Sequence, residues 1–271
     1  REISLAQRER LGLIHVRHSV SSLERAIHFV WSDSPGGAAE ARLAADITLH
    51  ALDEVERTLA ETLDHGPMLL RQDSPTSTRI DRLKILWEEV KASPTSQPLD
   101  RSRALQKLIG RVHEEISHTS DQVGLYSGPE KEIAALTDVV ALSLPLHVER
   151  LVLLHERLVL LPNRGMEEGW TEATREAAAI FCRQLQEEDV NRLTRSVQSA
   201  LDSDLKSDSP NHHFQGNFPA EATRLINGLH TLSATLESVA HNRVSGTPQD
   251  LDRSFHHALL SALQGWKVST E

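Results

Sequence analysis

The chain has 271 residues, of which 39 are acidic and 29 are lysine or arginine, so its formal charge is −10 at pH 7. Aromatic residues make up 4% of the chain and apolar residues 39%, which is sparse for a β-sandwich but ordinary for packed helices. The acidic balance argues against nucleic-acid binding, which needs clustered Lys and Arg. No apolar run reaches the about 20 residues that cross a bilayer.

Apolar residues recur at helical spacing through the first half of the chain. Between Leu13 and Val30 they alternate steps of three and four residues, the pattern of a helix with one buried stripe. In the following helix we expect Ile47, Leu52 and Val55 to face inward. Breaks rich in Ser, Pro and Gly separate the segments. The predicted helices of this half cover about 13–30, 38–65, 78–91 and 99–123.

The second half contains the longest apolar stripe of the chain. It starts after Pro129 and runs to Leu161, and Pro145 inside it is expected to bend the helix because proline removes a backbone hydrogen bond. No segment shows the alternation that is typical of a strand. Further helices are predicted over about 171–206, 225–239 and 248–266.

Eight helices predict an all-α fold, an elongated helical bundle. Because one four-helix bundle cannot bury eight apolar stripes, we expect two stacked four-helix bundles that share their longest helices. Residues 1–271 are predicted to form a single helical region. In it, the terminal helices would build one module and the central helices a second module.

Residues that could carry catalysis or bind a metal form no recognised set. Cys182 is the only cysteine, which excludes an intrachain disulfide and a thiolate zinc site. His113 and His118 are five residues apart, whereas a zincin helix needs a spacing of four. Glu115 and His118 have the E-x-x-H spacing of a di-iron bundle, but a second such pair is missing. We therefore expect no enzymatic activity, no metal site and no cofactor.

Three basic side chains are the candidate ligand-binding residues. His147 interrupts the longest stripe beside Pro145, where broken backbone pairing leaves a carbonyl group free. Arg111 and Arg150 lie on helices that we expect to be neighbours, and a guanidinium turned inward between helices could hold a small anion. Alternatively, both arginines lie at the stripe edges and pair with nearby glutamates. These glutamates are Glu114, Glu115 and Glu149.

The stretch over 124–149 carries a characteristic order of motifs. Gly124-Leu-Tyr-Ser-Gly-Pro-Glu130 is followed by Leu136-Thr-Asp138 and by Leu144-Pro-Leu-His-Val-Glu149. This order resembles that of the extracytoplasmic helical sensor regions of bacterial transmembrane receptors, which feed histidine kinases, diguanylate cyclases and chemoreceptors. Glu9-Arg-Leu-Gly-Leu13 and Trp87 also fall in the expected order, so the resemblance covers about residues 8–165.

The resemblance implies a periplasmic signal-sensing portion of an inner-membrane receptor, with membrane segments beyond the first and last helices. The module of the terminal helices would then be membrane-proximal and the module of the central helices distal. Because the sequence begins with Arg1 and not Met, we expect it to be a piece of a longer protein. It would bind a small-molecule or protein signal, form a homodimer in the full receptor, and transmit by displacing one helix against another. A soluble helical adaptor for protein partners and a helical metalloprotein are the alternatives.

Overall fold

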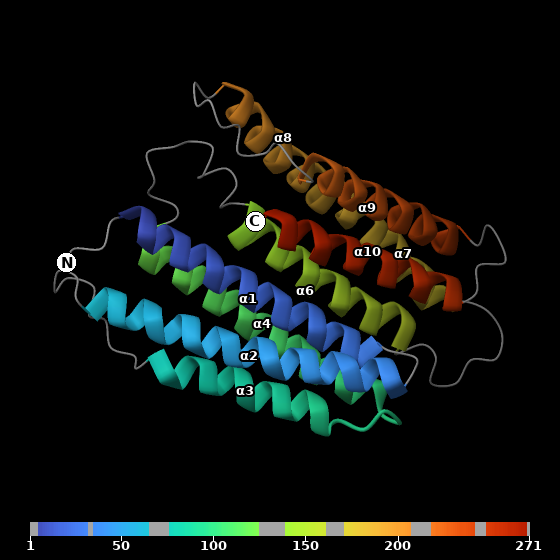
Figure 1. Ribbon diagram of the computed structural model, residues 1–271. Coiled ribbons are helices and arrows are strands. Elements are labelled where there is room, and N and C mark those ends of the chain that lie inside the picture. Colours follow the sequence, from blue (N-terminus) through green and yellow to red (C-terminus); the bar gives the residue numbers. More distant parts are fainter. Residues whose placement is uncertain are drawn as a thin grey trace. The chain divides into compact units, whose positions relative to one another are not determined.

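The computed structural model describes residues 5–31, 35–64, 76–124, 139–160, 171–206, 218–241 and 248–269. Within these ranges the chain forms eight helices and no strand, which confirms the predicted all-α fold (Figure 1). Two of the eight contain π-helical turns, in which each backbone bond reaches one residue further than in an α-helix. Among the described residues, no helix is both long and apolar enough to span a membrane.

The chain divides into two compact units, residues 1–130 with 270–271 and residues 131–269. Each unit contains four of the described helices. The first unit holds α1 (Leu5–Trp31), α2 (Pro35–Asp64), α3 (Thr76–Ala92) and α4 (Pro98–Val123). The second unit holds one helix over 139–160, one over 172–206, α9 (Phe218–Ala240) and α10 (Pro248–Ser269).

No described helix continues from one unit into the other, which differs from the predicted sharing of the longest helices. The end of α4 shows a physical reason. Gly124 follows Val123 with φ 74°, in the left-handed region, and its N–H bonds back to the carbonyl oxygens of Asp121 and Ser120. This cap ends the helix. The placement of either module relative to a membrane stays a prediction.

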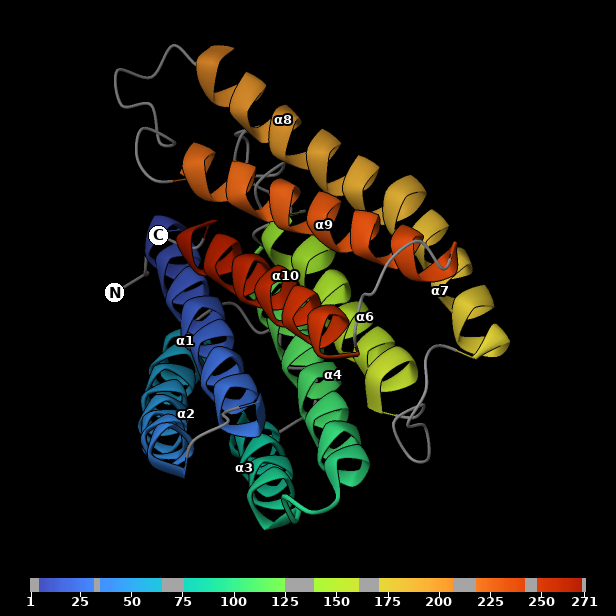
Figure 2. The same cartoon turned by 90° about the vertical axis from the view of Figure 1, so that its right-hand side faces the viewer.

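The four helices of the first unit pack as an antiparallel bundle (Figures 1 and 2). Between α2 and α3, Asp46 bonds to Trp87 and Asp53 bonds to Lys84, so residue numbers rise in one helix as they fall in the other. The polar pairs between α1 and α4 and between α3 and α4 follow the same opposed order. The first unit is therefore an up-and-down four-helix bundle.

The inward face of α2 differs in part from the prediction. Leu52 is buried as predicted, but Ile47 is 61% exposed. These residues are five apart, which is about 140° around a helix, so they cannot share a face. Ala41 and Ala45 are buried instead, so the inward face of this part of α2 consists of small side chains. The stripe predicted on α1 is confirmed by the burial of Val16, Val20, Leu23 and Ile27.

Helices α1 and α4 approach each other closely at one end of the first unit. A Cβ atom added at Gly12 of α1 would lie 2.5 Å from Cγ2 of Val123 on α4. Leu11 and Leu13, on either side of the glycine, pack against the same valine. The absence of a side chain at Gly12 therefore sets how near the two backbones come.

In the second unit, the helix over 139–160 consists of the π-helical turn η2 (Val139–Ser143), α6 (Leu144–His155) and the π-helical turn η3 (Glu156–Leu160). Pro145 lies in the first turn of α6, directly after η2. The π-helical turn shifts the backbone pairing at the point where proline lacks an N–H, so the helix continues through this residue. The predicted disturbance by Pro145 thus takes the form of a π-helical turn.

The remaining helices of the second unit meet along α9. The helix over 172–206 comprises α7 (Glu172–Gln184), the π-helical turn η5 (Leu185–Val190) and α8 (Asn191–Lys206). Cys182 Sγ of α7 lies 3.4 Å from the carbonyl oxygen of Ser233 on α9. On the α10 side, Thr235 Oγ1 of α9 lies 3.3 Å from Ser254 Oγ. Helix α9 therefore packs against both α7 and α10.

Candidate functional site

A carboxylate is buried inside the first unit. Glu115 of α4 is 1% exposed, and burying an unpaired carboxylate would cost several kcal/mol. Two guanidinium groups compensate its charge. Arg79 of α3 places Nε 3.8 Å from Oε2, and Arg111, one turn earlier on α4, pairs with Oε1. The ion cluster of Arg79, Arg111 and Glu115 thereby ties α3 to α4.

Arg111 is the first of the three predicted ligand-binding residues. Its side chain is 17% exposed and also pairs with the exposed Glu114, at 2.6 Å between Nη1 and Oε2. Spacings of three and four residues put both carboxylates on the same side of the helix as Arg111. Arg111 therefore pairs with glutamates of its own helix, which is the alternative to an anion site that the sequence analysis left open.

His147 and Arg150 both lie on α6 in the second unit, whereas Arg111 lies on α4 in the first. His147 is 2% exposed, as expected for a residue on the apolar stripe, and Arg150 is half-buried. An anion site that combines these three residues stays a prediction. Each unit instead contains a polar cluster of its own.

The contact between α1 and α4 is polar as well as apolar. His15 of α1 and Thr119 of α4 are fully buried, with 3.3 Å between His15 Nδ1 and Thr119 Oγ1. Thr119 follows Glu115 by four residues, so both lie on one face of α4. The buried hydroxyls of Ser19 and Ser22 donate to backbone carbonyls of α1 itself, at 2.9 and 2.8 Å. The interior of the first unit thus contains directional polar contacts at a helix boundary.

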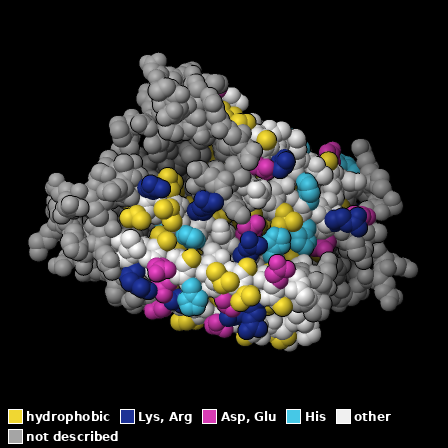
Figure 3. All heavy atoms as spheres, viewed as in Figure 1, with side chains coloured by type: hydrophobic (Ala, Val, Ile, Leu, Met, Phe, Trp, Pro, Cys, Tyr) yellow, Lys and Arg dark blue, Asp and Glu magenta, His cyan; other side chains and the backbone are white. Residues whose placement is uncertain are grey.

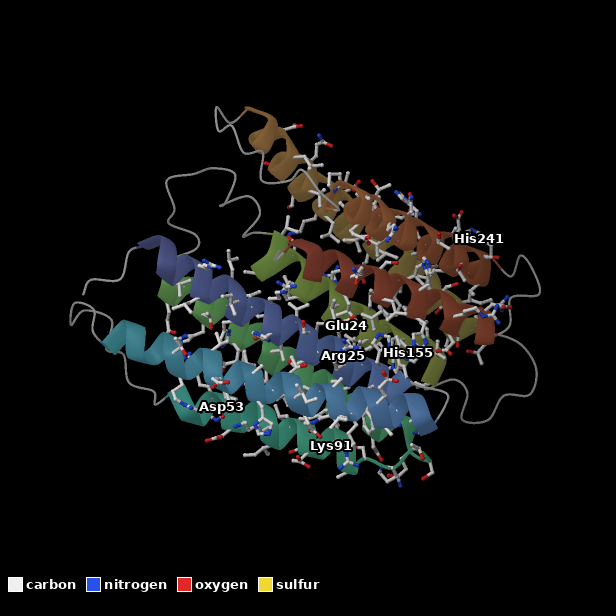
Figure 4. The ribbon with its side chains drawn as sticks, viewed as in Figure 1. Glu24, Arg25, Asp53, Lys91, His155 and His241 are labelled. Atoms are coloured by element: carbon white, nitrogen blue, oxygen red, sulfur yellow. The ribbon has the colours of Figure 1, made fainter. Side chains whose placement is uncertain are left out.

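A second set of contacts braces all four helices of the first unit. The guanidinium carbon of Arg101 (α4) lies 4.4 Å from the ring centre of Phe29 (α1), and Nη2 donates to the Phe29 carbonyl at 2.8 Å. Phe29 meets Trp87 (α3) edge to face at 5.4 Å. Trp87 Nε1 donates to Asp46 (α2) at 2.6 Å, and Lys91 pairs with the same carboxylate at 3.1 Å. Asp46 therefore joins α2 to α3 (Figure 4, which labels Lys91).

In the second unit, a histidine and an aspartate join α6 to α10. His155 is 4% exposed, and its Nε2 lies 2.6 Å from Asp252 Oδ1 (Figure 4 labels His155). The ring also meets Phe255 edge to face at 5.8 Å. The hydrogen bond with His155 lowers the pKa of Asp252; burial opposes this shift, while positive charge on His155 and His256 adds to it.

None of the pairings that join separate helices was predicted from the sequence, although Glu115 was named as a possible partner of Arg111. His155 shares a helix face with His147, eight residues earlier, and that spacing was the available signal. His15 shares a helix face with His18 in the same way, whereas Arg79 stands next to residues of its apolar stripe and gave no separate signal. Such positions are ambiguous because a polar residue at a stripe edge faces either water or a neighbouring helix.

The histidines of α4 do not assemble a metal site in the described part of the chain. Glu115, the first residue of the E-x-x-H pair, is bound by arginines, and His118 is exposed. Among the described residues, no group of three or more His, Cys, Asp or Glu side chains has the arrangement of a metal site. In these clusters the polar groups bind one another and connect helices.

Charged side chains of both signs are interspersed on the face shown in Figure 3, where Lys and Arg stand near Asp and Glu and between hydrophobic side chains. Among the residues described on this face, no broad surface of one sign is visible. No family model matches the chain, and no curated protein or solved structure is significantly similar to it. The fold and these clusters are therefore the basis for a functional proposal.

Proposed function

We propose that this chain is the extracytoplasmic signal-sensing domain of a membrane-anchored bacterial receptor, which transmits by displacement of helices and has no catalytic activity of its own. The observation that carries the proposal is the placement of polar contacts, each with at least one buried partner, at boundaries between helices. His15 meets Thr119 between α1 and α4, and His155 meets Asp252 between α6 and α10.

Polar contacts at these places have consequences that apolar packing does not have. A hydrogen bond is directional, so a shift of one helix by a fraction of a turn breaks it and leaves buried groups unsatisfied. The helices of such a bundle are therefore expected to adopt a few discrete arrangements, because intermediate positions leave the hydrogen bonds broken. A signal that binds one arrangement better than another then moves the population between them.

The resemblance adds the location and the output. In the receptors that this sequence resembles, the first and last helices of the sensor continue into membrane segments. In this chain those helices are α1 and α10, and α1 makes both the close approach at Gly12 and the polar contact at His15. A displacement of α1 against α4 is therefore the proposed route of the signal. Homodimer formation in the full receptor belongs to the same proposal.

The location is tested by the coding sequence that surrounds this chain. The proposal expects an apolar segment of about 20 residues before residue 1 and another after residue 271. A full-length open reading frame without them would contradict the receptor and would favour the soluble adaptor. Fractionation of cells that express the full-length protein checks the same point, since the receptor is expected in the inner membrane.

The transmission is tested by signalling output from the full-length protein. Gly12→Ala forces α1 away from Val123 of α4 and is expected to change the basal output. Gly110→Ala is the matched control, because a Cβ atom at Gly110 on α4 meets no atom within 4 Å. Equal basal outputs of both variants and the wild type, at equal protein levels, would contradict transmission through the contact between α1 and α4.

A further inference from the structure

A depression of about 270 Å³ lies between the last two turns of α1 and the first two turns of α2. Both helices belong to the first unit. The volume is just below the about 300–1,000 Å³ of pockets that hold drug-sized ligands, so any ligand here is smaller than those. The residues that line the depression are Arg25, His28, Trp31, Gly37, Glu40 and Ala41.

The depression carries opposite charges on its two walls. Arg25 projects from α1 (Figure 4), and Glu40 stands on α2. Both side chains are exposed, and neither forms an ion pair with another described residue. His28, half-buried one turn after Arg25, adds a ring N–H that can donate to an anion. One wall therefore suits a carboxylate and the opposite wall suits an ammonium group.

The apolar part of the depression is small. The half-buried indole of Trp31 and the buried methyl group of Ala41 contribute to its surface. An indole offers a flat face to an aliphatic or aromatic side chain and loses little conformational entropy when it is covered. A ligand that satisfies all the walls has a carboxylate, an ammonium group and a short apolar chain.

We propose that the depression between α1 and α2 binds a free α-amino acid with an apolar side chain. Arg25 and His28 hold its carboxylate, Glu40 holds its ammonium group, and the side chain lies against Trp31. This inference names a ligand class for the proposed sensor. Because Arg25 and Glu40 remain partly in water, the expected dissociation constant is about 1 mM.

The binding is tested by calorimetric titration of the whole chain with L-leucine and two truncated analogues. Isocaproate lacks the ammonium group of leucine, and isoamylamine lacks its carboxylate. Leucine is expected to bind one site per chain, about tenfold more tightly than either analogue, since each analogue loses one charge-assisted contact. No saturable binding of leucine up to about 10 mM, or equal binding of all three compounds, would overturn the proposal.

Two variants, each lacking one charge, test which wall of the depression holds the carboxylate of the ligand and which holds its ammonium group. Arg25→Gln is expected to weaken leucine about tenfold and to remove the preference for leucine over isoamylamine. Glu40→Gln is expected to weaken it similarly and to remove the preference over isocaproate. Arg42→Gln and Glu54→Gln are the matched controls, because both residues are exposed on α2 and do not line the depression. Test variants that bind leucine like their controls would overturn the assignment.

Tryptophan fluorescence gives a second measurement of the same site. Leucine is expected to change the emission of the wild type, and Trp31→Phe is expected to abolish that change while the other three tryptophans stay in place. A signal that persists in Trp31→Phe would place the ligand elsewhere. The sensor proposal is judged separately, since a receptor with membrane segments that does not bind amino acids would contradict this inference alone.

Discussion

Trp87 Nε1 of α3 donates a hydrogen bond of 2.6 Å to Asp46 Oδ1 of α2, and this bond joins the hydrophobic core of the first unit to its surface. The indole is 1% exposed, whereas the carboxylate side chain is 37% exposed. The bond satisfies the only polar atom of a large buried side chain. It also sets the register of α2 against α3, because the donor on a packed indole has one fixed position.

Replacing Trp87 with phenylalanine is expected to lower the free energy of unfolding by about 2 kcal/mol. The variant loses the hydrogen bond to Asp46, part of the edge-to-face contact with Phe29, and some buried volume. Urea unfolding followed by circular dichroism measures the change. Ile85→Ala on the same helix is the control, since Ile85 is 59% exposed and its truncation should change stability by no more than about 0.5 kcal/mol. Equal effects of the two variants would contradict the role of the bond.

The ion cluster inside the first unit predicts unequal roles for two neighbouring glutamates. Glu115→Ala leaves Arg79 and Arg111 without their buried carboxylate and is expected to cost about 3–5 kcal/mol. Glu114→Ala removes a partner of Arg111 whose side chain is 67% exposed, and is expected to cost less than about 1 kcal/mol. Equilibrium unfolding of both variants in urea checks the difference, and similar losses would show that Glu115 is not held as described.

The close approach of α1 and α4 predicts opposite effects for two glycine substitutions. Gly12→Ala places a Cβ atom 2.5 Å from the stiff side chain of Val123 and is expected to destabilise the chain by about 1–3 kcal/mol. Gly110→Ala meets no atom within 4 Å in the middle of α4 and is expected to stabilise it by about 0.5–1 kcal/mol.

A double mutant tests the cause of the first effect. Val123→Ala removes the atoms that the new methyl group would meet, so it is expected to reduce the cost of Gly12→Ala. Additive losses in the double mutant would mean that Val123 is not the obstacle. Thermal unfolding of the wild type, the two single mutants and the double mutant completes this double-mutant cycle.

The contact of His155 with Asp252 predicts a loss of stability in acid. The pKa of Asp252 is lowered in the folded chain, first by the hydrogen bond with His155. A group with a lowered folded pKa stabilises the fold above its unfolded pKa of about 3.9, and this contribution disappears as the pH falls through the lower folded value. Asp252→Asn should therefore flatten the decline of unfolding free energy below about pH 4.

The same measurement on Asp202→Asn is the control, because Asp202 lies on α8 and, within the described part of the chain, accepts a hydrogen bond from Gln198 of its own helix and from no other helix. Unfolding by urea at a series of pH values separates the two variants. If Asp252→Asn keeps the acid dependence of the wild type, the bond with His155 does not contribute to stability.

Much of the fold followed from the spacing of apolar residues, and the error on α2 shows where that reasoning ends. A run of leucines and valines at steps of three and four identified α1 and its buried face. On α2 the spacing of the large apolar residues predicted that Ile47 faces inward, whereas Ala41 and Ala45 are the buried residues. Burial of alanine depends on how close the neighbouring helix comes, and a single sequence does not contain that distance.

The candidate site was less accessible from the sequence than the fold. Arg111 was identified together with its possible glutamate partners, because ion pairs within one helix follow from spacing. Arg79, which binds the same Glu115 from α3, was not identified. A partner on another helix is specified by the register between helices, and no local pattern reports that register.

The order of polar and apolar residues along the chain was sufficient for the fold class and for most helix ends, since helix formation depends on contacts within a few residues. The starts of α1 and α9, at Leu5 and Phe218, lie eight and seven residues before the predicted ones. The pairings across helices needed the folded chain. His15 and Thr119 are 104 residues apart in sequence, and His155 and Asp252 are 97 apart. Each pair meets because the packing of its two helices sets a register that brings distant positions to hydrogen-bonding distance. For His15 and Thr119, the close approach of Gly12 to Val123 is one determinant of that register.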